Sequence, residues 1–139
     1  MLTNTSIEPT QLIKVRLLRR MTSAVLGGTH WLTPSELGAI FHKDKALVVR
    51  WLKEGKLFAI DRDGHQEFPR YVFDDKGIPL AAVQQILQEF GQASPMRVAS
   101  WFESTSATLN GRRPRELIAT EPDSVIAAAR LHALGPVHG

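Results

Sequence analysis

The chain has 139 residues, a length that fits one ordinary domain or two very small ones. It contains no cysteine, which excludes a disulfide framework, thiolate metal sites and a cysteine nucleophile. The first residues, MLTNTSIEPTQ, lack the apolar segment of a signal peptide, and no stretch approaches the roughly 18 consecutive apolar residues of a membrane span. We therefore expect a soluble, cytoplasmic protein that does not contact membranes.

The net charge of +3 is unevenly distributed along the chain. Residues 1–60 carry nine Lys/Arg against four Asp/Glu, whereas residues 61–91 carry three against six and residues 92–139 carry five against four. A basic first part indicates an anionic partner for that part and a different role for the rest.

The first predicted helix covers residues 9–26 and ends at Gly27-Gly28. Its apolar residues recur every four positions, which predicts one buried stripe made of Ile13, Leu17, Met21 and Val25.

Two short helices are predicted next. Thr33-Pro34-Ser35-Glu36 has the pattern of a capping box with proline at the first helical position, and it predicts a helix over 34–41. Asp44 is placed to cap a second helix over 45–54, which Gly55 ends. The inward residues would be Leu37, Ile40 and Phe41 in the first helix, and Leu47, Val48, Trp51 and Leu52 in the second.

Two short helices joined by a tight polar turn are typical of a helix-turn-helix. The second helix would be the recognition helix, with Ala46 and Val49 among its outward residues. The predicted DNA-binding residues are the four cations in and before that helix: Lys43, Lys45, Arg50 and Lys53.

A β-hairpin is predicted after the second helix. Leu57, Phe58 and Ile60 indicate a strand, and Asp63-Gly64 is a hairpin turn signal. The return strand would contain Phe68, Tyr71, Val72 and Phe73, with Pro69 restricting it to an edge or a bulge.

With this hairpin as a wing, the first part resembles the winged helix-turn-helix of the MerR and excisionase kind. The matching residues are Leu32-Thr33-Pro34-Ser35-Glu36-Leu37 and then Val48, Trp51-Leu52-Lys53-Glu54-Gly55-Lys56-Leu57. The hairpin departs from a wing that lies on phosphate because it is acidic, with Asp61, Asp63, Glu67, Asp74 and Asp75.

Four further helices are predicted, over 79–90, from Ser94-Pro95 to Glu103, from Pro114 to Leu117, and over 121–134 with Thr120 and Asp123 as its caps. The last helix is apolar nearly all round, so most of its sides must be covered. It is either a central core helix or a helix that meets another chain, and the second possibility predicts a homodimer.

The segment 95–135 resembles the toxin-binding domain of the Xre/MbcA/ParS antitoxin family. The positions that carry the resemblance are Trp101, Leu109, Gly111, Pro114, Leu117, Ile118, Val125 and Gly135. The resemblance implies an antitoxin that neutralises a RES-type, NAD-consuming toxin by stoichiometric binding over its active site, and that represses its own operon by binding operator DNA. It implies toxin-binding roles for Trp101, Leu109, Arg112, Arg113, Pro114, Leu117, Val125 and His138. Arginines there would suit a site that holds NAD phosphates.

No pattern for catalysis, cofactor binding or metal binding is found. The five histidines (His30, His42, His65, His132 and His138) have no metal-ligand spacing, and there is no GxGxxG or P-loop. The three tryptophans, Trp31, Trp51 and Trp101, are expected on helical faces as core residues. We therefore expect a binding protein, not an enzyme, without cofactor or metal.

The predicted fold is mainly α with a small two-stranded β-hairpin, an α+β class. Residues 1–91 would form the winged helix-turn-helix region and residues 92–139 the helical toxin-binding region. The alternative function is a stand-alone winged-helix transcription regulator whose C-terminal helices only dimerise.

Overall fold

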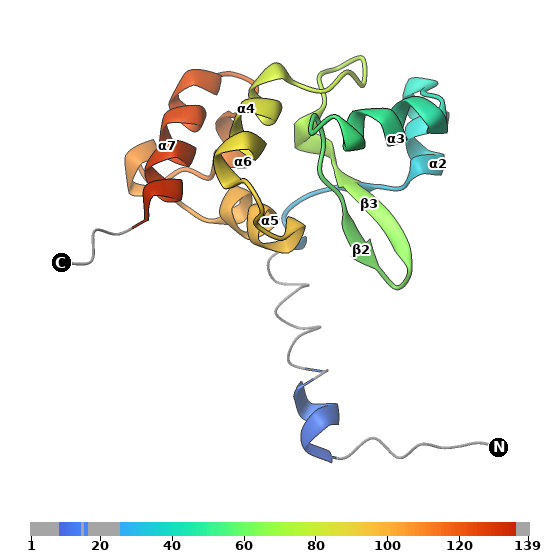
Figure 1. Cartoon of the computed structure of the whole chain (residues 1–139), viewed down its shortest axis with the longest axis horizontal. Helices are drawn as coiled ribbons and strands as arrows, with labels where there is room; N and C mark the ends of the chain where they lie inside the picture. The colour runs from blue at the N-terminus through green and yellow to red at the C-terminus, as the bar shows by residue number, and fades with distance from the viewer. Residues whose placement is uncertain (1–8, 15, 17–25, 136–139) are drawn as a thin grey trace.

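The computed structural model describes residues 9–14, 16 and 26–135. Residues 9–14 are helical, and so is Leu26 before the turn at Gly27-Gly28. The later elements, in chain order, are β1 (Trp31–Leu32), α2 (Pro34–Phe41), α3 (Lys45–Lys53), β2 (Ile60–Arg62), β3 (His65–Pro69), the 3-10 helix η1 (Arg70–Val72), α4 (Ala81–Phe90), α5 (Pro95–Glu103), the 3-10 helix η2 (Ala107–Leu109), α6 (Pro114–Leu117) and α7 (Pro122–Leu134). The fold is therefore mainly helical with a small antiparallel sheet, as the sequence predicts. α2, α3 and the β2–β3 hairpin lie on one side, and α4 to α7 gather on the other (Figure 1).

The sheet has three strands in the order β1-β3-β2, so the predicted hairpin gains a partner strand that the sequence did not indicate. β1 pairs with β3 through Leu32 opposite Phe68 and Trp31 opposite Pro69. The expectation that Trp31 lies on a helical face is therefore wrong, although its side chain is buried like those of Trp51 and Trp101. The short β1 places the chain at the start of α2, so the sheet and the two helices form one unit.

The predicted return strand is wrong in its extent. It runs over His65–Pro69, and Tyr71 and Val72 lie in η1 instead. The two-residue turn at Asp63-Gly64 sets the register, so pairing begins directly at His65, and the two-residue β1 pairs with β3 only as far as Pro69. Pro69 ends the strand. It pairs with β1 through Trp31, whereas the β2 pairing ends at Glu67, so Pro69 is unpaired on its β2 side, as the edge prediction requires.

Helix starts were predicted well where a side-chain cap exists. The Thr33 side chain accepts from the Glu36 N–H at 3.1 Å, and the Glu36 carboxylate accepts from the Thr33 N–H at 2.9 Å, as a capping box requires. Ser94 caps α5 in a similar way. The predicted cap of the last helix is wrong: the capping position is Glu121, without a side-chain hydrogen bond, and not Thr120.

Three apolar side chains are more exposed than the periodicity predicts. Ile13, expected in a buried stripe, is 63% exposed, and Ile40 of α2 is 52% exposed. Leu17, Met21 and Val25 of the same stripe lie outside the described residues. On α7, Leu131 is also exposed, while Val125, Ile126, Ala128 and Ala129 are buried. Periodicity identifies an apolar face, but it does not identify which neighbour covers it.

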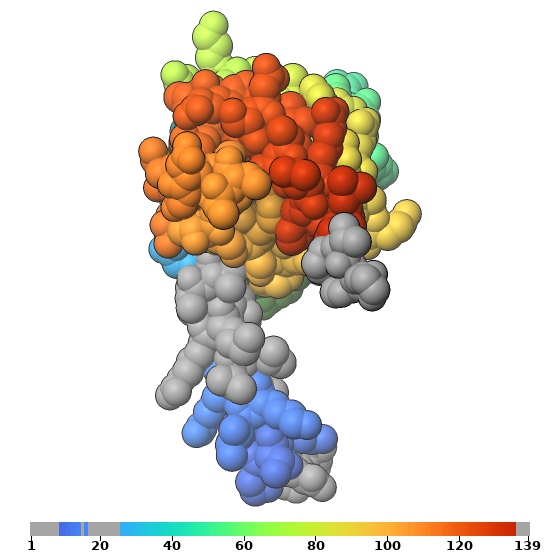
Figure 2. Space-filling model, turned by 90° about the vertical axis from the view of Figure 1, so that its left-hand side faces the viewer, coloured from blue at the N-terminus to red at the C-terminus, as the bar shows by residue number. Residues whose placement is uncertain are grey.

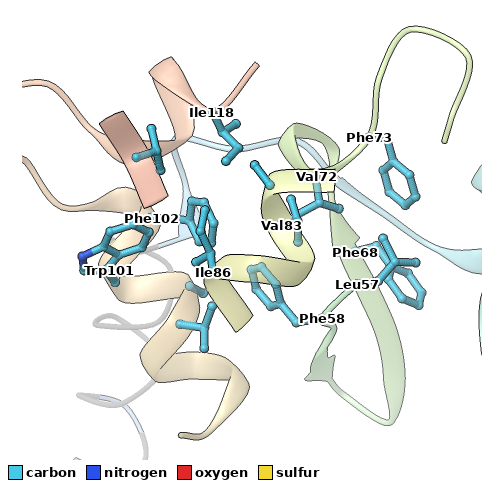
Figure 3. Packing of buried hydrophobic residues seen from close by; sticks show 14 of the residues in the cluster. Leu57, Phe58, Phe68, Val72, Phe73, Val83, Ile86, Trp101, Phe102 and Ile118 are labelled. Carbon is cyan, nitrogen blue, oxygen red and sulfur yellow. The ribbon is translucent and has the colours of Figure 1, made fainter. Parts of the chain in front are cut away.

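The core is one cluster to which both predicted regions contribute (Figure 3). Phe58, just before β2, stacks on Phe102 of α5 with ring centroids 5.8 Å apart and an angle of 14° between the planes. Tyr71 of η1 lies 4.8 Å from the same Phe102 ring. The division at residues 91 and 92 stays a prediction, but the two sides share buried aromatic contacts.

No helix in the described ranges is long and apolar enough to cross a membrane.

Candidate nucleic-acid interface

Helix α3 separates its side chains into a buried face and an exposed face. Successive residues advance about 100° around a helix, so nine residues are enough to define both faces. Val48 and Trp51 are buried, and Leu47 and Leu52 are partly buried against the core. The opposite side, called the α3 outer face from here on, is exposed and consists of Lys45, Ala46, Val49, Arg50 and Lys53.

The α3 outer face carries three cations and no carboxylate. None of Lys45, Arg50 and Lys53 forms an ion pair with another residue in the described part of the chain. The fourth predicted cation, Lys43, lies in the turn before α3 and is partly buried. Three of the four predicted DNA-binding residues are thus brought together on one helix face.

The turn between α2 and α3 is fixed by local hydrogen bonds. His42 ends α2 in the left-handed conformation, with φ 56° and ψ 36°, and its N–H donates to the Gly38 carbonyl at 3.1 Å. The Asp44 side chain accepts from the Ala46 N–H at the start of α3. Because both ends of the turn are capped, local hydrogen bonds contribute to the orientation of α3 relative to α2.

The end of α2 is also held by a contact that sequence reasoning missed. The Arg70 guanidinium lies 5.0 Å from the centroid of the Phe41 ring, and its Nη1 donates to the Phe73 carbonyl at 3.0 Å. The Phe73 ring lies 6.3 Å from Phe41. Gly77 completes the enclosure, because a Cβ there would lie 2.4 Å from Phe41 Cγ. These residues lie about 30 positions from Phe41 in sequence, and no local pattern links them.

Replacing Gly77 by alanine should destabilise the protein by more than the same change at Gly64. Both glycines have positive φ, 79° and 84°, so both substitutions place alanine in a strained backbone conformation, at about 1 kcal/mol. Only Gly77→Ala also places a methyl group against the Phe41 ring. Adding atoms to a packed site typically lowers the free energy of unfolding by a further 1–3 kcal/mol, roughly. Urea unfolding of the two variants measures the difference. Equal losses would show that Phe41 is not enclosed as described.

Asp74, beside this enclosure, gives the region a pH dependence. The Ile78 N–H is the main cause that lowers the pKa of Asp74, followed by the Lys76 N–H and by the charges of Lys76 and Lys43. Because the pKa is lower in the folded state, the stabilisation is present above the ordinary value of about 3.9 and is lost as the pH falls through the lowered value. We expect Asp74→Asn to lower the urea midpoint at pH 7 and to differ less from the unmodified chain at pH 3. A difference that is constant with pH would exclude the charge as its cause.

The β2–β3 hairpin is an acidic neighbour of α3. Asp61 and Asp63 are exposed, whereas Glu67 pairs with Arg62 at 3.4 Å. Exposed carboxylates repel phosphate, so the hairpin does not provide a phosphate-binding wing. Of the hairpin and α3, only α3 presents an exposed face with cations and no carboxylate.

The predicted toxin-binding residues have a different place in the structure. Five of them are buried: Trp101, Leu109, Pro114, Leu117 and Val125. Arg113 is partly buried and its Nε donates to the Glu103 carbonyl at 2.8 Å. Arg112 is exposed and pairs with Glu116 at 3.5 Å, while His138 lies outside the described residues. The positions that carry the family resemblance thus mostly build the core of the C-terminal part.

Sequence reasoning also missed a partly buried ion pair at Glu103. Arg115 Nε donates to the Glu103 carboxylate at 2.7 Å, and the Thr29 hydroxyl donates to its other oxygen. The Glu103 side chain is only 7% exposed. This carboxylate therefore links the segment before β1 to α5 and α6, which fixes the N-terminal elements against the C-terminal ones.

A groove opens between α5, η2 and α7. Its volume is about 470 Å³, and Trp101, Ala128, Leu131 and His132 line it together with Arg97 and a row of hydroxyl side chains. Figure 2 views this side, with α7 in red beside the orange segment that includes η2 and α6. Within the described ranges, no three His, Asp or Glu residues form a group that could hold a metal ion.

Comparison with known proteins gives one structural likeness. No protein-family model matches the chain, and no curated protein matches it. A solved structure titled "NMR structure of Rv2175c" superposes with a TM-score of 0.66 at 18% sequence identity, covering 76% of this chain and 82% of that one. At this identity the likeness concerns the fold alone: most of this chain has the fold of Rv2175c.

Proposed function

We propose that the chain is a DNA-binding protein of the winged helix-turn-helix kind, in which α3 enters the major groove. The observation that carries the proposal is the α3 outer face, with Lys45, Arg50 and Lys53 exposed on one side of a helix whose preceding turn is capped at both ends. This geometry therefore favours the alternative function from the sequence analysis, a winged-helix transcription regulator, over the antitoxin.

The physical support is the match between this face and a duplex. The major groove is wide enough for an α-helix, and a recognition helix presents its exposed side chains to the base edges. The α3 outer face has three cations and no carboxylate that would neutralise them. These cations are therefore available for phosphates and bases. An acidic hairpin next to them leaves α3 as the part that approaches the DNA.

Fluorescence anisotropy with the full chain and a labelled random-sequence duplex tests the proposal. We expect binding at low salt that weakens as salt is added, with a slope of about −3 in log K against log salt, since each neutralised phosphate contributes about −0.9. A single-stranded probe should bind more weakly. Absence of duplex binding at low salt would contradict the proposal.

A second proposed function is neutralisation of a RES-type toxin by the C-terminal part. It is the function that the resemblance to the Xre/MbcA/ParS antitoxin family implies. The observation that favours it is apolar surface at the end of α7, where Leu131 is 56% exposed and Leu134 is 80% exposed next to the groove. Exposed apolar patches commonly mark protein interfaces. The buried family positions would act by shaping this surface, not by contact.

Co-expression with the neighbouring gene product, followed by growth, NAD measurement and pull-down, tests this second function. We expect rescue by the unmodified chain and loss of rescue with Leu131→Glu/Leu134→Glu, while Arg50→Gln/Lys53→Gln still rescues. A neighbour that is harmless alone, or rescue that the two glutamates do not affect, would contradict it.

A further inference from the structure

We propose that the α3 outer face prefers a site in which a guanine lies within about two base pairs of a thymine. Arg50 would contact the guanine O6 and N7, and Ala46 with Val49 would contact the thymine methyl group. This inference rests on the proposed DNA binding and adds the sequence that is bound.

The first support is the order of side chains around α3. At about 100° per residue, the order across the face is Lys45, Val49, Lys53, Ala46 and Arg50. The two apolar side chains thus lie between the cations, and Val49 is 38% exposed. Phosphate binding does not need an apolar side chain there. In the major groove, the apolar group that such a side chain meets is the C5-methyl of thymine.

The second support is the position of Arg50. It is exposed and follows Ala46 by one helical turn, which is about 6 Å along the axis or roughly two base-pair steps. A guanidinium has a planar fork of donors that fits guanine O6 and N7 together, whereas an ammonium does not. Lys45 is the first residue of α3 and Lys53 is the last. From these positions their long side chains can reach the phosphates on either side of the major groove.

Selection of bound duplexes from a random pool, with the full chain, is the first step of the test. We expect an enriched motif with guanine and thymine at most two base pairs apart. Uracil in place of that thymine removes one methyl group and should weaken binding about fourfold. 7-Deazaguanine in place of the guanine removes the N7 acceptor and should weaken binding about tenfold.

Matched variants then assign each effect to its side chain. In Ala46→Ser/Val49→Ser the uracil effect should disappear, and in Arg50→Gln the 7-deazaguanine effect should disappear. Lys53→Gln should weaken binding to every duplex and keep both effects. Duplex binding without an enriched motif, or effects that persist in the matched variants, would overturn this inference and leave the proposed DNA binding intact. Absence of any duplex binding would overturn the proposed function itself.

Discussion

The variant Arg50→Gln/Lys53→Gln should bind duplex DNA about 100-fold more weakly than the unmodified chain. An arginine at a base contributes about 1–3 kcal/mol, and a lysine at a phosphate contributes a salt-dependent part of the affinity. Both side chains are exposed on the α3 outer face, so glutamine removes the charge without disturbing the core. The slope of log K against log salt should become shallower by about 1, because Lys53 is the one of the two that neutralises a phosphate. Anisotropy titrations at several salt concentrations measure both quantities.

The matched control is Arg97→Gln/Arg112→Gln. These two arginines are also exposed, but they lie in α5 and in the loop before α6. The control changes the net charge by the same amount, so it separates a local contact from general attraction. An equal loss in both double variants would mean that the DNA-binding site is not located on α3.

The substitution Phe102→Ala should destabilise the protein by about 3–5 kcal/mol, the usual range for a buried phenylalanine. The Phe102 side chain is fully buried and contacts Phe58, Tyr71 and Trp101. Because these neighbours come from both sides of residue 91, unfolding should remain one transition that involves the whole described core. Chemical denaturation followed by tryptophan fluorescence and by circular dichroism measures it.

Leu134→Ala is the control for this prediction. Leu134 is 80% exposed, so its truncation should change the free energy of unfolding by no more than about 0.5 kcal/mol. Two separate transitions in Phe102→Ala, or a loss as small as that of Leu134→Ala, would contradict the shared core.

The parts of the fold that the sequence predicted are those decided by neighbouring residues. The capping box at Thr33 and Glu36, the cap at Asp44 and the turn at Asp63-Gly64 all act within a few positions, and each is present in the structure. The two faces of α3 follow from helical periodicity, so the exposure of Lys45, Arg50 and Lys53 on one face was predicted correctly.

What the sequence could not predict depends on contacts between distant residues. The pairing of Trp31 with Pro69 and the enclosure of Phe41 by Arg70 and Gly77 have no local signal. Ile40 has the right spacing for burial, but it is 52% exposed and no element in the described part of the chain covers it.

The resemblance to the antitoxin family likewise does not locate a toxin-binding surface. Its positions are tryptophan, leucine, isoleucine, proline, glycine and valine, and such residues often recur because the fold needs them. Trp101, Pro114 and Val125 are accordingly buried, and Arg112 is exposed. A motif of this kind therefore predicts the C-terminal fold more directly than it predicts the surface that binds a partner.

The most direct test of DNA binding by α3 is a titration of ¹⁵N-labelled chain with a short duplex, followed residue by residue through amide chemical shifts. We expect the largest shift changes over residues 43–53, with small changes on α5 and α7. Shift changes concentrated on α5 and α7, or no changes at a duplex concentration in large excess, would contradict the assignment of α3 as the DNA-binding element.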